Sequence, residues 1–266
     1  MMIFNISKTL WTYRSFILGN MKREFQSKYQ NSLLGALWNV INPLAMIVVY
    51  TVIFAEIMRA KLPGVDSTYA YSIYLCAGVL TWGFFAEITS RSQNVFIENA
   101  NILKKINFPR VCLPITIVCN ALVNFVIVFG LFTLFLIISG NFPGLVYLTL
   151  IPVYIITILL AVGIGITLGV LNVFFRDVGH FFGIFMQFWF WLTPIVYPVT
   201  IIPERYRALI NINPMSGIMS SCQNILVKHI PPVWNDLISA VFVAIFFNLV
   251  GLYLYRRHVG EMVDEL

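Results

Sequence analysis

The longest stretch without an ionisable residue sets the fold class. Residues 111–175 contain no Asp, Glu, Lys, Arg or His, and after Asp177 only His180 interrupts a second apolar run that lasts to Glu204. Apolar runs of 18 or more residues are typical of membrane-spanning helices. These runs do not alternate with polar positions, which argues against a membrane β-barrel. The sequence therefore predicts an all-α membrane protein.

Composition supports this class. Only 11% of the 266 residues are charged and 59% are hydrophobic, whereas soluble domains carry about 25% charged residues. The net charge is +6, and the basic residues cluster beside apolar runs. That placement fits lipid headgroups and membrane topology rather than nucleic acid.

A membrane span needs about 20 apolar residues. Residues 33–266 are expected to form one transmembrane domain with six spans, at about 33–57, 69–88, 111–138, 145–171, 179–198 and 233–255. Residues 1–32 precede it. Apolar residues recur there at helical spacing: Leu10, Tyr13, Ile17, Met21 and Phe25. This stripe is typical of an amphipathic helix on the cytoplasmic membrane surface.

The basic residues also predict the orientation. Six spans put both termini on one side, and that side carries 12 of the 17 Lys and Arg residues. The positive-inside rule therefore places both termini in the cytoplasm. On this topology Arg176 and Asp177 lie in a tight cytoplasmic turn between the fourth and fifth spans.

Two features concern helix packing. Pro43 inside the first span predicts a kink, because proline removes one helical hydrogen bond. Ala161, Gly165 and Gly169 recur every four residues in the fourth span, a pattern that lets another helix approach closely.

The stretch from 193 to 233 is too apolar for a solvated loop, and its prolines prevent a simple span. We expect short re-entrant helices at the periplasmic interface, provided that protein covers their irregular backbone. The prolines are Pro194, Pro198, Pro203, Pro214 and Pro231.

No catalytic, nucleotide-binding or metal site is expected in this chain. It has no GxxxxGK[ST] motif, no HExxH, no GxSxG and no paired Cys/His ligand set,. Its four cysteines lie mostly in apolar stretches and are interpreted as packing residues. The spans hold almost no ionisable groups, so ion coupling is disfavoured and energy for transport is expected from another subunit.

Aromatic residues within the spans have two interpretations. They can form weak, repeated contacts along sugar rings, or they can pack against protein and lipid. The connection at 89–110 is polar with a helical pattern, and is interpreted as an amphipathic cytoplasmic helix that a motor protein contacts; a solvated loop is the alternative.

Four segments in order resemble the membrane subunits of type-2 ABC exporters, in the branch that exports O-antigen, teichoic acid and capsule-like polymers. They are YQNSLLGALWNVINPL (29–44), NANILKKINFPR (99–110), VFFRDVGHF (173–181) and YPVTIIPERYRALININPM (197–215).

The resemblance implies a homodimeric permease of the bacterial inner membrane with two copies of a separate ATPase, which binds the ATP and Mg. It implies a polyprenyl-diphosphate-linked glycan as substrate, moved from cytoplasm to periplasm. The expected contacts with the ATPase are Glu98, Asn99, Asn101, Leu103, Lys104, Lys105, Pro109, Arg110, Arg176 and Asp177. The expected channel-lining aromatics are Trp38, Tyr50, Trp82, Phe84, Phe85, Trp189 and Trp191.

Three alternatives stay open at this point. The first is a drug- or lipid-exporting permease of the same superfamily, which needs a closed pocket instead of a continuous channel. The second is a membrane glycosyltransferase using a polyprenyl carrier, which needs a carboxylate site at the membrane face. The third is a passive channel, which the absence of polar rings disfavours.

Overall fold

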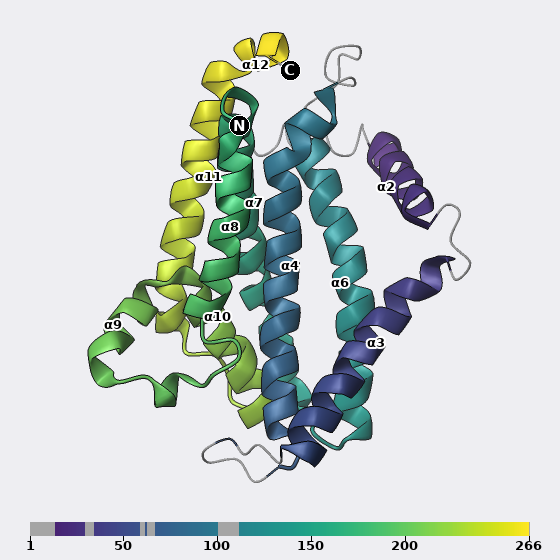
Figure 1. Cartoon of the computed structure of the whole chain (residues 1–266), viewed down its shortest axis with the longest axis vertical. Coiled ribbons are helices and arrows are strands. Elements are labelled where there is room, and N and C mark those ends of the chain that lie inside the picture. The colour runs from purple at the N-terminus through teal and green to yellow at the C-terminus, as the bar shows by residue number, and fades with distance from the viewer. Residues whose placement is uncertain (1–13, 30–34, 59–61, 63–66, 101–111, 266) are drawn as a thin grey trace.

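The computed structural model describes residues 14–29, 35–58, 62, 67–100 and 112–265. In these ranges the chain is mostly helical, and its long helices run side by side (Figure 1). No β-strand occurs among the described residues. The helical architecture of the prediction is confirmed.

Five helical segments of the described chain are long and apolar enough to cross a membrane. They match the predicted spans 33–57, 69–88, 111–138, 145–171 and 233–255. They are α3 (Trp38–Thr51) continued by η2 (Val52–Ile57), α4 (Ala70–Glu98), α6 (Cys112–Ile138), η3 (Gly144–Thr149) continued by α7 (Leu150–Phe174), and η6 (Trp234–Leu237) continued by α11 (Ile238–His258). The chain is therefore a multi-pass membrane protein.

Helix α4 is longer than predicted. It continues from the expected end at residue 88 to Glu98, so residues 89–98 extend the span instead of starting a separate helix. Ser92, Val95 and Phe96 in this extension are buried, and packing against neighbouring helices keeps the backbone helical. Residues 101–110 of the predicted cytoplasmic helix lie outside the described residues.

The predicted span at 179–198 corresponds to α8 (Asp177–Leu192), which has 16 residues. At 1.5 Å per residue it is about 24 Å long, less than the roughly 30 Å of hydrocarbon in a bilayer. The predicted end at residue 198 is wrong for a local reason. Pro194 disfavours helical backbone in the residue before it, and Thr193 is extended, with φ −98° and ψ 136°.

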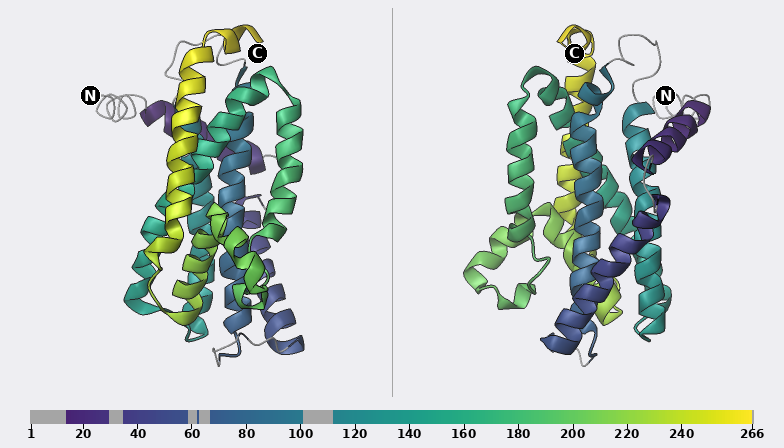
Figure 2. Two further views of the ribbon diagram at one scale, coloured as in Figure 1. Left: turned by 90° about the vertical axis from the view of Figure 1, so that its left-hand side faces the viewer. Right: turned by 45° about the vertical axis from the view of Figure 1, so that its right-hand side comes forward.

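Helix α7 lies between α4 and α11 and approaches both closely. A β-carbon on Gly165 would lie 2.5 Å from Cβ of Ser92 in α4, and one on Gly163 would lie 2.9 Å from the backbone nitrogen of Asn248 in α11. Gly165 and Gly169 of the predicted small-residue stripe thus pack against α4 at points where no larger residue fits,. Helix α4 is the most buried of the five candidate spans, with α8 and α9 to one side of it and α2, α3 and α6 to the other (Figure 2, right).

Short helices fill the stretch between α8 and α11, as predicted, while their re-entrant placement at the periplasmic interface stays a prediction. They are η4 (Val199–Ile201), α9 (Glu204–Ile212), α10 (Pro214–Gln223) and η5 (Asn224–Lys228). Side chains of α4 donate hydrogen bonds to backbone carbonyls of the extended segment that precedes these short helices. The hydroxyl groups of Tyr71 and Tyr74 donate to the carbonyls of Val196 at 2.7 Å and of Tyr197 at 2.9 Å. Irregular backbone is tolerated within a membrane only where protein supplies such partners.

The amino-terminal helix α2 (Arg14–Tyr29) lies at the same end of the bundle as the carboxy-terminal helix α12 (Glu261–Glu265) (Figure 1). Ile17 is buried in a small apolar cluster with Val95 and Cys112, and Met21 packs against that cluster. Part of the predicted apolar stripe therefore contacts protein. Leu10 and Tyr13 of that stripe lie outside the described residues.

Candidate functional site

The turn between α7 and α8 carries the first pair of predicted coupling residues. Helix α7 ends at Phe174 and α8 begins at Asp177, so the chain reverses within two residues. Arg176 and Asp177 are both exposed. Asp177 stands in the first turn of α8, where a negative charge interacts favourably with the helix dipole,. The predicted tight turn is confirmed, and its two charges face outward.

Asn172 connects this turn to α4. Its side-chain nitrogen donates to the carbonyl of Gln93 at 3.3 Å and to Oδ1 of Asn94 at 3.2 Å. Its side-chain oxygen accepts from the backbone N–H of Gly179 at 3.0 Å. One buried amide therefore bridges α7, the start of α8 and the last turns of α4. The sequence reasoning missed Asn172, although a lone amide between apolar residues just before Arg176 is a visible signal.

The second group of predicted coupling residues lies at the end of α4. Glu98 is the last residue of α4 and is exposed, and the side chain of Asn99 donates to the carbonyl of Val95 at 2.9 Å. The other six lie outside the described residues: Asn101, Leu103, Lys104, Lys105, Pro109 and Arg110. Because Asn94 precedes Glu98 by one helical turn, the hydrogen bonds of Asn172 place both groups of predicted coupling residues at one end of the bundle.

A chain of polar side chains runs from this end into the bundle. Arg91 of α4 forms ion pairs with Glu24 of α2 and, at 3.6 Å, with Glu87 one turn below. Asn120 of α6 donates to Glu24, and Asn124 donates to Glu87 at 3.0 Å. These five residues are called the polar chain below. The spacing of Glu87 and Arg91, typical of a helical ion pair, was readable in the sequence; their partners on α2 and α6 were not.

Two hollows flank the polar chain. One, of about 430 Å³, lies between α2, α4 and α6 and is lined by Glu24, Arg91 and Glu98. The other, of about 380 Å³, is lined by Trp38, Asn42, Glu87 and Asn124 and separates α3 from α4 and α6. We call the second hollow the α3 groove. Glu87 and Asn124 thus join the polar chain to a largely apolar groove beside the first span.

The structure separates the predicted channel aromatics into two groups. Trp82, Phe85 and Trp189 are buried together, with ring centroids 5.4–5.9 Å apart. Phe84 is buried and stacks on Phe125.

The remaining three predicted channel aromatics are more accessible in the single chain. Trp38 is 48% exposed and Trp191 is 63% exposed, while Tyr50 is half-buried. A channel-lining role stays a prediction for all seven aromatics, and Trp38 and Trp191 present the most surface to a substrate or a second subunit.

The described residues contain no group of three or more His, Cys, Asp or Glu side chains placed to hold a metal ion. Of the four cysteines, Cys76, Cys112 and Cys222 are buried and Cys119 is partly buried. All four thiols are free.

Three known proteins that are similar to this chain are named for the export or transport of a polysaccharide. The chain is similar to the O-antigen export system permease protein RfbA of Klebsiella pneumoniae, 30% identical over 88% of both chains. It is 28% identical to the RfbA protein of Myxococcus xanthus, over 99% of this chain and 100% of that one. It is also 23% identical to the polysialic acid transport protein KpsM of Escherichia coli, over 91% of this chain and 93% of that one.

The family comparison covers the helical bundle from α2 to η5. Residues 16–227 match the ABC-2 type transporter family. This range includes the turn at Arg176, the polar chain and the α3 groove. The chain therefore belongs to the ABC-2 type transporter family, whose members are the membrane subunits of ABC transporters.

Proposed function

We propose that this chain is the permease subunit of an ABC transporter that exports a polysaccharide. The observation that carries the proposal is the set of relatives: those named for O-antigen export and the one named for polysialic acid transport all handle polysaccharides, and they align with this chain over nearly its whole length. The same relatives favour polysaccharide over the drug- or lipid-exporting permease and over the glycosyltransferase. The substrate is a polyprenyl-diphosphate-linked glycan that moves from the cytoplasm across the inner membrane.

In this proposal the end of the bundle that carries α12 and the α7–α8 turn faces the cytoplasm. The positive-inside rule supports this orientation. Arg23 lies in α2 and Arg176 in the α7–α8 turn, while Arg91 and Arg257 lie near the last residues of α4 and α11, and these helices finish at that end of the bundle (Figure 1). The short helices α9 and α10 then lie at the periplasmic side, and both termini are cytoplasmic.

The ATPase subunits, which hold the ATP and Mg, dock at the cytoplasmic end. Glu98 and the Arg176–Asp177 turn are exposed there, and Asn172 joins them through α4. A displacement of the turn by the ATPase would be transmitted to α4 through the hydrogen bonds of Asn172.

The translocation path lies between two copies of the chain. The outward faces of α3 and α8 support this arrangement, because large apolar side chains on both are exposed in the single chain, among them Val48, Trp38, Phe188 and Trp191. In a soluble protein such surfaces signal a partner; here they face lipid or a second copy. Trp38 and Trp191 are the aromatics that we propose for the path.

Export measured in cells tests the proposal. Cells that lack this chain but retain its ATPase are expected to accumulate lipid-linked glycan inside and to lose surface polysaccharide, and the wild-type chain is expected to restore it. Undiminished surface polysaccharide without the chain would refute the function. Co-purification tests the assembly, since a 2:2 complex with the ATPase is expected.

Coupling is tested by Glu98→Gln and Arg176→Ala. Each variant is expected to insert normally and to keep ATP hydrolysis while export falls. Arg205→Ala is the matched control, because Arg205 is an exposed arginine in α9 at the other end of the bundle. Equal export by all three variants would remove Glu98 and Arg176 from the coupling surface.

A further inference from the structure

Helix α10 and the η5 segment that continues it have two unlike faces. One face is apolar and fully buried in the core, with Met215, Met219 and Ile225 among its side chains. The other carries a polar residue at every fourth position: Ser216, Ser220, Asn224 and Lys228. Residues four apart share one side of a helix, so these side chains form a continuous polar stripe.

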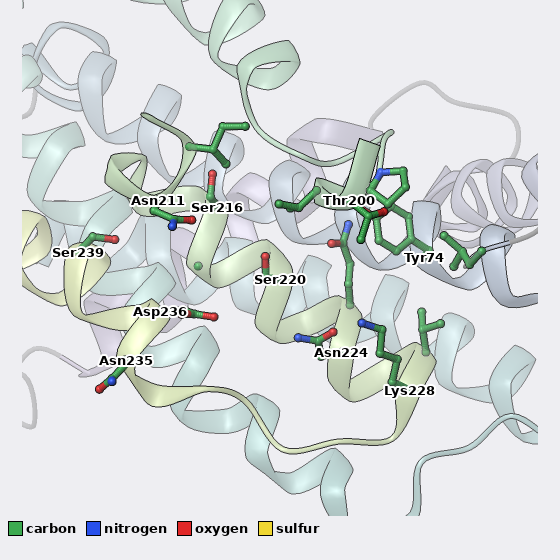
Figure 3. A pocket seen from close by; sticks show the side chains of 17 residues that line it. Tyr74, Thr200, Asn211, Ser216, Ser220, Asn224, Lys228, Asn235, Asp236 and Ser239 are labelled. Carbon is green, nitrogen blue, oxygen red and sulfur yellow. The ribbon is translucent and has the colours of Figure 1, made fainter. Parts of the chain in front are cut away.

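The polar stripe lines a cavity of about 480 Å³, which we call the serine pocket (Figure 3). Its other walls come from elements far apart in the sequence. Asp236 and Ser239 lie on the stretch that opens α11, Asn211 lies on α9, and Tyr74 lies on α4. The volume is within the range of pockets that bind small organic molecules.

Two hydroxyl groups of the serine pocket lack a hydrogen-bond partner within the described part of the chain: Oγ of Ser216 and Oγ of Ser239. Ser216 is only 4% exposed. Burying a hydroxyl without a partner is costly, and native proteins seldom leave one unsatisfied. Both residues line the cavity, and rotation of either side chain about its Cα–Cβ bond would let a molecule bound there supply the missing partner.

The composition of the walls indicates the chemistry of that molecule. Serine hydroxyls and the side-chain amides of Asn211, Asn224 and Asn235 each donate and accept hydrogen bonds,, as sugar hydroxyls do. The lining holds one cation, Lys228, and one anion, Asp236, so the charges of its described residues balance. A diphosphate is recognised by excess positive charge, which this pocket lacks. The Tyr74 ring adds an apolar surface suited to the face of a sugar ring.

We propose that the serine pocket binds a sugar residue of the exported polysaccharide as the chain leaves the permease. The proposal rests on the proposed function, which supplies the substrate and places α10 on the periplasmic side. Ser216 and Ser239 donate to, or accept from, hydroxyl groups of the sugar. The pocket thus holds the emerging polymer at one end of the path, away from the α3 groove.

Binding measurements on the purified permease–ATPase complex test the proposal. The probe is an oligosaccharide released by mild acid from the surface polysaccharide of the cell that carries this chain. Loss of one hydrogen bond of ordinary strength weakens binding about fivefold, so Ser216→Ala is expected to raise the Kd about fivefold. Ser216→Ala combined with Ser239→Ala is expected to raise it about 25-fold.

Ser92→Ala is the matched control. Ser92 also has a buried hydroxyl without a partner among the described residues, but it lies at the contact of α4 with Gly165. If the two pocket hydroxyls are only packing features, all three variants bind the probe like the wild type, and the proposal fails. It also fails if the wild-type complex does not bind the probe at millimolar concentration.

A second measurement does not depend on the loss of a hydrogen bond. Ser220→Cys places a thiol in the serine pocket, and the oligosaccharide is expected to slow its reaction with N-ethylmaleimide severalfold; the wild-type chain gives the background from its own cysteines. An unchanged rate at saturating oligosaccharide would overturn the proposal. Normal export by the wild-type chain in the same cells separates this failure from failure of the proposed function.

Discussion

Gly165→Ala tests how closely α4 and α7 approach each other. The added β-carbon would lie 2.5 Å from Cβ of Ser92 and 3.1 Å from the carbonyl oxygen of Thr89, whereas ordinary contact begins at 3.4 Å. Neither neighbouring atom can rotate away, because one is a β-carbon and the other belongs to the backbone. The two helices must therefore separate by about an ångström, and overpacking of this kind costs about 1–3 kcal/mol.

The gain in helix propensity from glycine to alanine offsets part of this cost, by about 0.5–1 kcal/mol. Because the closest contact is under 3.0 Å, we expect the upper part of the overpacking range and a net destabilisation of about 1–2 kcal/mol. Gly130→Ala in α6 is the matched control, since nothing lies within 4 Å of a β-carbon there. That variant is expected to be neutral or stabilising.

Thermal unfolding of the purified complex in lipid nanodiscs measures the difference. In soluble domains of similar size 1 kcal/mol shifts the Tm by about 2–4 °C, so Gly165→Ala is expected to melt several degrees below Gly130→Ala. Adding Ser92→Gly removes the nearest clashing atom and is expected to recover part of the loss. Equal melting of the two alanine variants, or no recovery in the double variant, would refute the close approach.

Three further predictions concern the hydrogen-bonded contacts. Asn172→Ala removes the partner of the Gly179 N–H and is expected to lower export in proteoliposomes while ATP hydrolysis continues; a parallel fall of both rates would contradict this. Arg91→Met removes a cation that pairs with Glu24 and is expected to speed amide hydrogen exchange in α2, with a cost of only about 1 kcal/mol because the pair is partly exposed,; unchanged exchange would count against the contact. Tyr74→Phe leaves a carbonyl after α8 without its donor, at a cost of about 1–2 kcal/mol,, and is expected to accelerate limited proteolysis there, whereas wild-type cleavage rates would show that the hydroxyl is dispensable.

Much of the fold follows from the position of charges along the chain. The charge-free run from 111 to 175 determined two spans to within a few residues, because a helix satisfies its own backbone hydrogen bonds in lipid and an irregular chain does not. The end of α8 at Leu192 was readable from Pro194, which restricts Thr193, although the prediction placed it at residue 198. The length of α4 was not. Its last turns are polar in sequence and become buried only through contact with α7 and α2.

The functional residues were harder to predict for the same reason. The pair Glu87 and Arg91 lies on one helix face, but Glu24 reaches Arg91 across 67 positions of sequence, and no local pattern indicates such a contact. The positions of the aromatic residues were difficult to predict for a different reason. A tryptophan in a span has the same sequence signature whether it is exposed on the single chain, like Trp191, or lies in the core, like Trp82.

The tight glycine contacts of α7 have a consequence for how relatives of this chain diverge. Gly163 and Gly165 each meet a neighbouring helix where no larger residue fits, so mutation at these positions is disfavoured whatever polymer is carried. The outward faces of α3 and α8 carry no such restriction. Selection for a new cargo can therefore alter those surfaces, within the limits set by the proposed contact between two copies, while the packing of α7 against α4 and α11 stays unchanged.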